Sequence, residues 1–70
     1  MGKRRERKAQ RERQEQARQE LEALGRELRS AYAAFDDASD AALTEAVILE
    51  IGALQARYGR SLRALKALYQ

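Results

Sequence analysis

The sequence predicts an all-α protein: an antiparallel two-helix hairpin that self-associates into a four-helix arrangement. Two long stretches, residues 21–35 and 43–69, carry apolar residues at alternating steps of three and four, the repeat of an amphipathic helix. One acidic break, residues 36–40, separates them. No strand pattern is visible, and none of the 70 residues is proline, so neither helical pattern is interrupted.

The first helix is expected over residues 14–36, where strong helix formers dominate. Its apolar residues follow steps close to a heptad repeat. They are Ala17, Leu21, Leu24, Leu28, Ala31, Tyr32 and Phe35. In residues 1–13 the helix-forming composition continues but the apolar stripe disappears. An all-polar helix is marginal on its own, so this segment is expected to be a frayed arm attached to the hairpin of residues 14–70.

The loop is expected over residues 37–40 and the second helix over residues 41–69. Asp36 and Asp37 favour ending the first helix, because negative charge is unfavourable at a helix C-terminus. Ser39 and Asp40 are good N-cap residues for the second. The stripe of the second helix consists of Leu43, Val47, Ile51, Leu54, Tyr58, Leu62 and Leu65, followed by Leu68 or Tyr69.

The two stripes differ in length, and this mismatch predicts a binding surface. A turn centred near Ala38 pairs residue i with about residue 77 − i, as neighbours in a helical hairpin require. The leucines after Tyr58 then fall opposite the polar residues 9–15. A lone hairpin leaves them uncovered, so we expect a homodimer or another helical protein to cover them. The predicted interface residues are Tyr58, Leu62, Leu65, Leu68 and Tyr69.

Positive charge is concentrated in the arm. Residues 1–13 hold seven Lys/Arg and two Glu, a net charge of +5, whereas the rest of the chain holds seven Lys/Arg and nine Asp/Glu, a net charge of −2. The candidate phosphate-contacting residues are Lys3, Arg4, Arg5, Arg7, Lys8, Arg11 and Arg13. No aromatic residue lies among them to stack on bases, so nucleic-acid binding would be independent of sequence. An anionic membrane surface, an acidic protein patch or a purely solubilising terminus are the alternatives.

Enzymatic chemistry has little support. The chain has no cysteine and no histidine, so the commonest nucleophile–base pairs and metal ligands are missing. The carboxylates of residues 36–40 sit in one exposed loop without other donors, which is typical of a capped, solvated turn rather than a metal site. We therefore expect no catalytic residue, no metal, no cofactor and no small-molecule substrate.

The sequence shows neither the pattern of a membrane span nor that of a secretion signal. No uncharged run approaches the roughly 20 apolar residues of a membrane span. The basic start is not followed by the apolar region that a secretion signal needs. With no cysteine in the chain, these features lead us to expect a cytoplasmic protein.

Residues 27–66 carry a set of helical motifs in a fixed order. An aromatic pair, Tyr32 and Phe35, precedes the cap at Ser39-Asp40; an aliphatic-Glu-aliphatic core then spans residues 46–51, and the pair Arg57-Tyr58 follows. In this order the chain resembles the YaaL family of small bacterial proteins, a domain of unknown function. Ala41 departs from the family pattern, which favours proline at the first helical position. The resemblance implies a bacterial cytoplasmic origin and an all-α hairpin, without an assigned activity.

The function expected from the sequence is therefore non-enzymatic. The main hypothesis is a protein-interaction or adaptor module that uses the exposed apolar seam of the second helix. The alternative is sequence-independent nucleic-acid binding through the arm. Gly52 and Gly59, one heptad apart and off the main seam, either let another helix approach closely or are tolerated on a solvent face.

Overall fold

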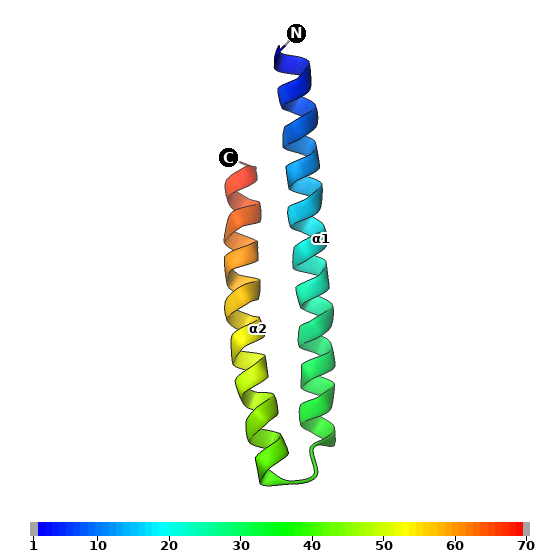
Figure 1. The fold of residues 1–70 in the computed structure, drawn as a ribbon, viewed down its shortest axis with the longest axis vertical. Coiled ribbons are helices and arrows are strands. Elements are labelled where there is room, and N and C mark those ends of the chain that lie inside the picture. Colours follow the sequence, from blue (N-terminus) through cyan, green and yellow to red (C-terminus); the bar gives the residue numbers. More distant parts are fainter. Residues whose placement is uncertain (1, 70) are drawn as a thin grey trace.

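The chain folds into two helices that lie side by side in opposite directions (Figure 1). The structure, a computed structural model, describes residues 2–69. Helix α1 comprises Gly2–Asp37, helix α2 comprises Ala41–Leu68, and residues 38–40 connect them. The rod measures 60 × 14 × 12 Å. Its radius of gyration is 16.9 Å, against about 11 Å for a compact domain of this length. The predicted all-α hairpin is confirmed for the described residues.

The turn is held by a single capping residue. Asp40 adopts an extended backbone conformation, and its Oδ1 accepts a hydrogen bond of 2.8 Å from the Leu43 backbone N–H. The Thr44 hydroxyl donates to the Asp40 carbonyl at 2.9 Å. Asp40 therefore fulfils the predicted N-cap role, and Ala41 begins α2 as expected. Helix α1 ends at Asp37, one residue later than predicted.

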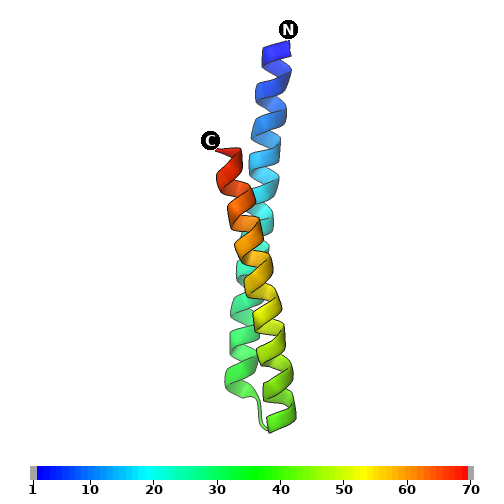
Figure 2. The same cartoon turned by 90° about the vertical axis from the view of Figure 1, so that its left-hand side faces the viewer.

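A narrow seam between the helices forms the core. Its buried members are Leu24, Ala31, Val47, Ile51 and Leu54, with Leu28 and Tyr58 partly buried against them. Steps of three and four continue this seam along α2 to Ser61, Leu65 and Leu68. Ser61 is only 9% exposed and occupies the central position at which Leu62 was predicted. Figure 2 shows α2 passing across α1, the gentle winding that a heptad seam favours.

The first helix is longer than predicted. The structure continues α1 through the basic residues to Gly2 instead of beginning it near residue 14. Two contacts join this segment to the end of α2: the side-chain amides of Gln10 and Gln14 donate to the Leu68 carbonyl at 2.7 and 2.9 Å. That carbonyl is one of the acceptors left free at a helix C-terminus. Fraying of the arm in solution stays a prediction for the residues before Gln10, which extend beyond α2 (Figure 1).

Several α1 side chains contact α2 residues that come later in the sequence than the predicted partner, residue 77 − i. The ring of Tyr58 lies 3.8 Å from where a β-carbon on Gly25 would stand, and Glu27 pairs with Arg57. These partners lie six or seven positions beyond those expected. Side chains lean toward the N-terminus of their own helix, which is away from the turn on α1 and toward it on α2. Two side chains whose tips touch therefore belong to residues with higher numbers, on both helices, than the residues whose backbones lie at the level of that contact.

Candidate interaction surfaces

The leucines predicted to form an exposed overhang are not free in the hairpin. Leu62, Leu65 and Leu68 are each half-buried. They lie level with a part of α1 in which Gln10, Gln14 and Ala17 are also half-buried. The expectation of an uncovered overhang is therefore wrong, because α1 continues as a helix and covers the end of α2. Of the other predicted interface residues, Tyr58 is half-buried beside Gly25, and Tyr69 is 65% exposed. Whether any of the five contacts a partner stays a prediction.

Exposed apolar side chains gather instead on one side of the turn half. A groove of about 530 Å³ opens there between the helices, and we call it the side groove. It is lined by Tyr32, Phe35, Asp36, Ile48, Ile51, Gly52 and Gln55. Tyr32 is 47%, Phe35 40% and Ile48 51% exposed. The Gln55 amide donates to the Tyr32 hydroxyl at 2.7 Å across the groove, so the aromatic ring is held in place by a polar contact.

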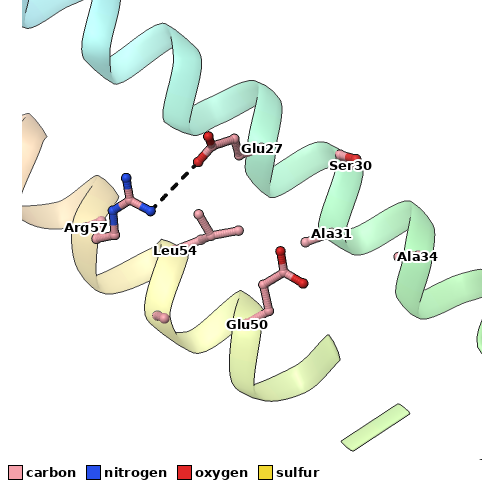
Figure 3. Close-up of a pocket in the computed structure, with 8 residues that line it drawn as sticks. Glu27, Ser30, Ala31, Ala34, Glu50, Leu54 and Arg57 are labelled. Atoms are coloured by element: carbon pink, nitrogen blue, oxygen red, sulfur yellow. Dashed lines mark ion pairs between the residues drawn. The ribbon is translucent and has the colours of Figure 1, made fainter. Parts of the chain in front are cut away.

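A second groove, of about 500 Å³, lies on a different side of the seam, and its character differs. Small residues line much of it, among them Ser30, Ala34 and Ala53, and charged side chains border it (Figure 3). Glu27 and Arg57 approach each other to 4.0 Å there, and each side chain is 55% exposed. Such a solvent-exposed pair contributes about 0–1 kcal/mol and is screened by salt. Three charged side chains, Glu27, Glu50 and Arg57, border this groove, whereas Asp36 is the one charged residue that lines the side groove.

The seven predicted phosphate-contacting residues do not all share one surface. In the helical arm Lys3, Arg4, Arg7 and Arg11 line one shallow groove of about 410 Å³. Arg13 adjoins it through a second groove and donates to the Gln10 side-chain oxygen at 2.6 Å. Arg5 and Lys8 are exposed but line neither groove. Helix formation thus places Lys3, Arg4, Arg7 and Arg11 along one side of the arm. Lys8 lies at the edge of that side, one turn after Arg4, and Arg5 lies further round the helix.

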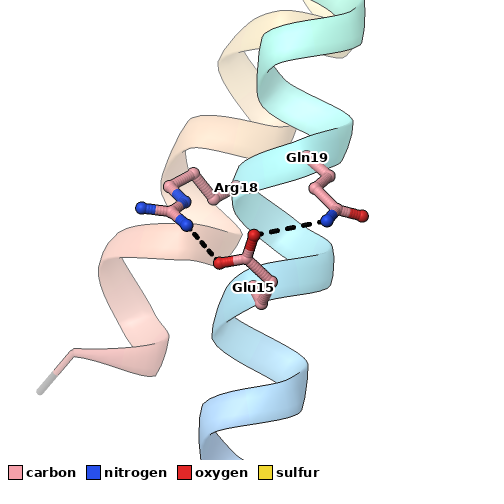
Figure 4. Close-up of polar contacts among 3 residues, drawn as sticks. All are labelled: Glu15, Arg18 and Gln19. Atoms are coloured by element: carbon pink, nitrogen blue, oxygen red, sulfur yellow. Dashed lines mark hydrogen bonds and ion pairs between the residues drawn. The ribbon is translucent and has the colours of Figure 1, made fainter.

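The basic arm ends at a mixed-charge segment of α1. The Glu15 carboxylate accepts hydrogen bonds from Arg18 and, at 3.2 Å, from the Gln19 amide (Figure 4). All three residues are exposed. From here to Arg29 charges of both signs are interspersed along α1, four acidic and three basic. On α1 the positive charge is therefore concentrated in the arm, and residues 57–68 of α2 add four Lys/Arg without an acidic residue.

The two ends of the rod carry charges of opposite sign. Comparing the net charge of residues 1–13 with that of residues 14–70 did not reveal this feature. Residues 1–13 carry a net charge of +5. Residues 30–56, which form the turn half, contain no Lys or Arg and five acidic residues, a net charge of −5. The acidic residues are Asp36, Asp37, Asp40, Glu45 and Glu50. The signal was present in the sequence as the long interval without a cation between Arg29 and Arg57, but only the hairpin fold makes it one end of a molecule.

Metal-holding clusters and the hydroxyl side chains are the remaining candidates for a site in the part of the chain that the structure describes. Within residues 2–69 no three acidic side chains are placed to hold a metal ion. Thr44 is engaged with the Asp40 carbonyl, and Ser61 is buried in the seam. Neither helix of this region is long and apolar enough to cross a membrane. The surfaces available to a partner are thus the side groove and the charged ends.

Comparison with known proteins gives no relative: no protein-family model matches the chain, and neither a curated protein nor a solved structure matches it. The resemblance to the YaaL family stays a prediction that rests on the order of its motifs.

Proposed function

We propose that this chain is a non-enzymatic protein-interaction module that binds a helix along the exposed side of α2. One observation carries the proposal: large apolar side chains lie exposed around the side groove although the hairpin seam is complete without them. The surface used is the side groove and its continuation along α2. A bacterial cytoplasmic setting is part of the proposal and rests on the YaaL resemblance.

The elongated hairpin has enough accessible surface for such an interface. The chain exposes 5725 Å². A compact folded monomer of 8.0 kDa exposes about 4,450 Å², so the hairpin has an excess of about 1,300 Å². A standard protein–protein interface covers about 800 Å² on each partner. The excess is thus enough for one such interface, and the side groove is its most apolar part.

The test compares two neighbouring aliphatic residues. Ile48 borders the side groove and is 51% exposed, whereas Leu49 is 70% exposed and does not line it. A dye attached through Ser39→Cys, which introduces the chain's single cysteine, reports diffusion of the protein in buffer and in bacterial lysate. We expect association with a partner to slow the diffusion of the labelled chain. Ile48→Gln should abolish this slowing, and Leu49→Gln should preserve it. Equal effects of the two substitutions would contradict the proposal, because general stickiness would then explain the association.

A second candidate function, sequence-independent nucleic-acid binding, is favoured by the continuity of α1. As a helix, the arm places Lys3, Arg4, Arg7 and Arg11 on one surface rather than scattering them along a coil. Four phosphate contacts would give a slope of about −3.6 in the logarithm of the binding constant against that of salt concentration. No aromatic side chain lies among these residues to stack on a base.

Fluorescence anisotropy with a short DNA duplex tests this candidate across a salt series. Replacing Arg4 and Arg7 by Gln should reduce the slope by about two contacts. The control, Arg5→Gln with Lys8→Gln, removes the same charge outside the groove and should reduce the slope less. Identical slopes for both double variants would show that only net charge matters, and an undetectable interaction at low salt would remove the candidate.

A further inference from the structure

One side of α2 carries a second stripe with heptad spacing next to the hairpin seam; Gly59 and Leu62 in it are half-buried, and its other positions are exposed. Its positions follow steps of four and three, and we call it the second stripe: Ile48, Gly52, Gln55, Gly59, Leu62, Lys66 and Tyr69. The first of these residues line the side groove. The repeat is the one by which two helices pack at close range. The second stripe therefore has the form of an interface for another helix.

The two glycines are not required by the hairpin itself. A β-carbon on Gly52 would meet no atom within 4 Å, and one on Gly59 would meet only the flexible end of Arg63 at 3.5 Å. Each glycine costs about 1 kcal/mol relative to alanine in a helix interior. Glycines on a helix surface allow another backbone to approach closely. Their place on the second stripe, beside exposed Ile48 and Tyr69, fits a closely packed neighbour.

The second stripe is complementary to itself over residues 48–62 when it is reversed. A twofold axis through Gln55 would place Ile48 of one copy near Leu62 of the other, and Gly52 near Gly59. Large side chains then meet large ones, and glycine meets glycine. A twofold interface requires this kind of self-complementarity, because each residue meets the same set of residues on both copies.

The charges at the two ends of the rod also favour antiparallel packing of the two copies. With the axis at Gln55, the end of α2 at Leu68 falls level with Ala42 of the second copy. Gln10 and Gln14 lie at that level of α1, so Arg11 and Arg13 fall level with the acidic turn half of the other copy, which has a net charge of −5. The rest of the arm, whose net charge over residues 1–13 is +5, extends past that turn. The favourable contact occurs twice in the dimer. A parallel dimer would instead bring like ends together, which is unfavourable at separations within the Debye length of about 8 Å.

Resting on the proposed function, we infer that the partner on this surface is a second copy of the chain. The two copies pack antiparallel through their second stripes, with Gln55 at the twofold axis. The dimer is a four-helix arrangement in which each acidic turn lies beside the other copy's basic arm.

Spin labels on Ser39→Cys measure the orientation directly. Gln55 lies 15 residues after Asp40, so at 1.5 Å per residue the two turns should be about 45 Å apart in the antiparallel dimer. Parallel packing would put the labels within about 20 Å of each other, two helix diameters. A distance near the longer value supports the inference, and the shorter distance overturns it.

Salt dependence gives an independent readout from the unlabelled protein. Raising the salt from low to high concentration should weaken the antiparallel dimer on the order of tenfold, because opposite charges at both ends are screened. Association that strengthens with salt contradicts the inference, since it indicates that like ends meet. A chain that is monomeric in buffer, yet associates in lysate through Ile48, would overturn the second copy as partner and leave the proposed function intact. No association in either medium would overturn both.

Discussion

Substitution of Gly52 by alanine has opposite expected effects on the isolated hairpin and on the dimer. In the hairpin the added methyl group meets no atom within 4 Å. Alanine should therefore stabilise α2 by about 1 kcal/mol through helix propensity. For a domain of this size, that corresponds to a rise of about 4–8 °C in melting temperature.

In the dimer the same methyl group enters the interface twice, where Gly52 of each copy faces Gly59 of the other. We expect the dissociation constant to rise at least about tenfold, a loss of about 1.4 kcal/mol of association free energy. Melting followed by circular dichroism over a range of protein concentrations separates the two effects. The dilute variant should melt at a higher temperature than the dilute wild type, and this advantage should shrink or reverse as the concentration rises.

Ala56 provides the matched control, because it is exposed on α2 one turn beyond Gly52 and outside the second stripe. Ala56→Gly should lower stability by about 1 kcal/mol at every concentration. A constant gain for Gly52→Ala across the whole concentration range would refute the reasoning, because it would show that no backbone approaches Gly52 in solution.

Three further predictions test the hairpin itself. Leu54→Ala should lower the unfolding free energy by about 2–5 kcal/mol in urea titration, because Leu54 is 6% exposed in the seam. Leu49→Ala, at a side chain 70% exposed, should change it by less than about 0.5 kcal/mol. Asp40→Ala should cost about 1 kcal/mol by removing the acceptor for the Leu43 N–H, whereas Ser39→Ala should have little effect; equal losses would refute the capping assignment. Amide hydrogen exchange should be fast in residues 2–8 and slow in the part of α1 that packs against α2. Uniform protection along the whole of α1 would contradict a fraying arm.

Much of the fold could be predicted from the sequence because it depends on local patterns. Steps of three and four mark the seam, and Asp40 supplies a side-chain oxygen where the first N–H groups of α2 are free. Both features act within a few residues along the chain. The bounds of α2 and the position of the turn therefore agree with expectation to within about one residue, the usual uncertainty of a helix boundary.

The polar part of the seam could not be predicted from apolar residues alone. Gln10 and Gln14 continue the heptad spacing of α1, and Ser61 occupies the matching inward position on α2. The apolar residues alone place Leu62 at the centre of the seam, and they begin the first helix near residue 14 rather than at Gly2. Counting strict heptads from Leu24 toward the N-terminus would have reached both glutamines, but not their shared acceptor at the Leu68 carbonyl.

The residues predicted for the interface divide between two stripes of α2. Leu62 and Tyr69 belong to the second stripe, whereas Leu65 and Leu68 belong to the hairpin seam. Tyr32, Phe35 and Leu43 were expected in the seam, yet each is at least 40% exposed. Hydrophobicity alone does not distinguish two neighbouring stripes on one helix. The distinction depends on which stripe the other helix covers, and this follows from the rotation of α2 about its own axis.

The most direct test of the second stripe as an interface is the mass of the native chain by sedimentation equilibrium, beside Ile48→Gln and Leu49→Gln. We predict that the wild type and Leu49→Gln sediment with twice the chain mass of 8.0 kDa at micromolar concentration, and that Ile48→Gln sediments as a folded monomer. A wild-type chain that stays monomeric and folds cooperatively at that concentration, or an Ile48→Gln variant that associates as tightly as the wild type, would contradict the account.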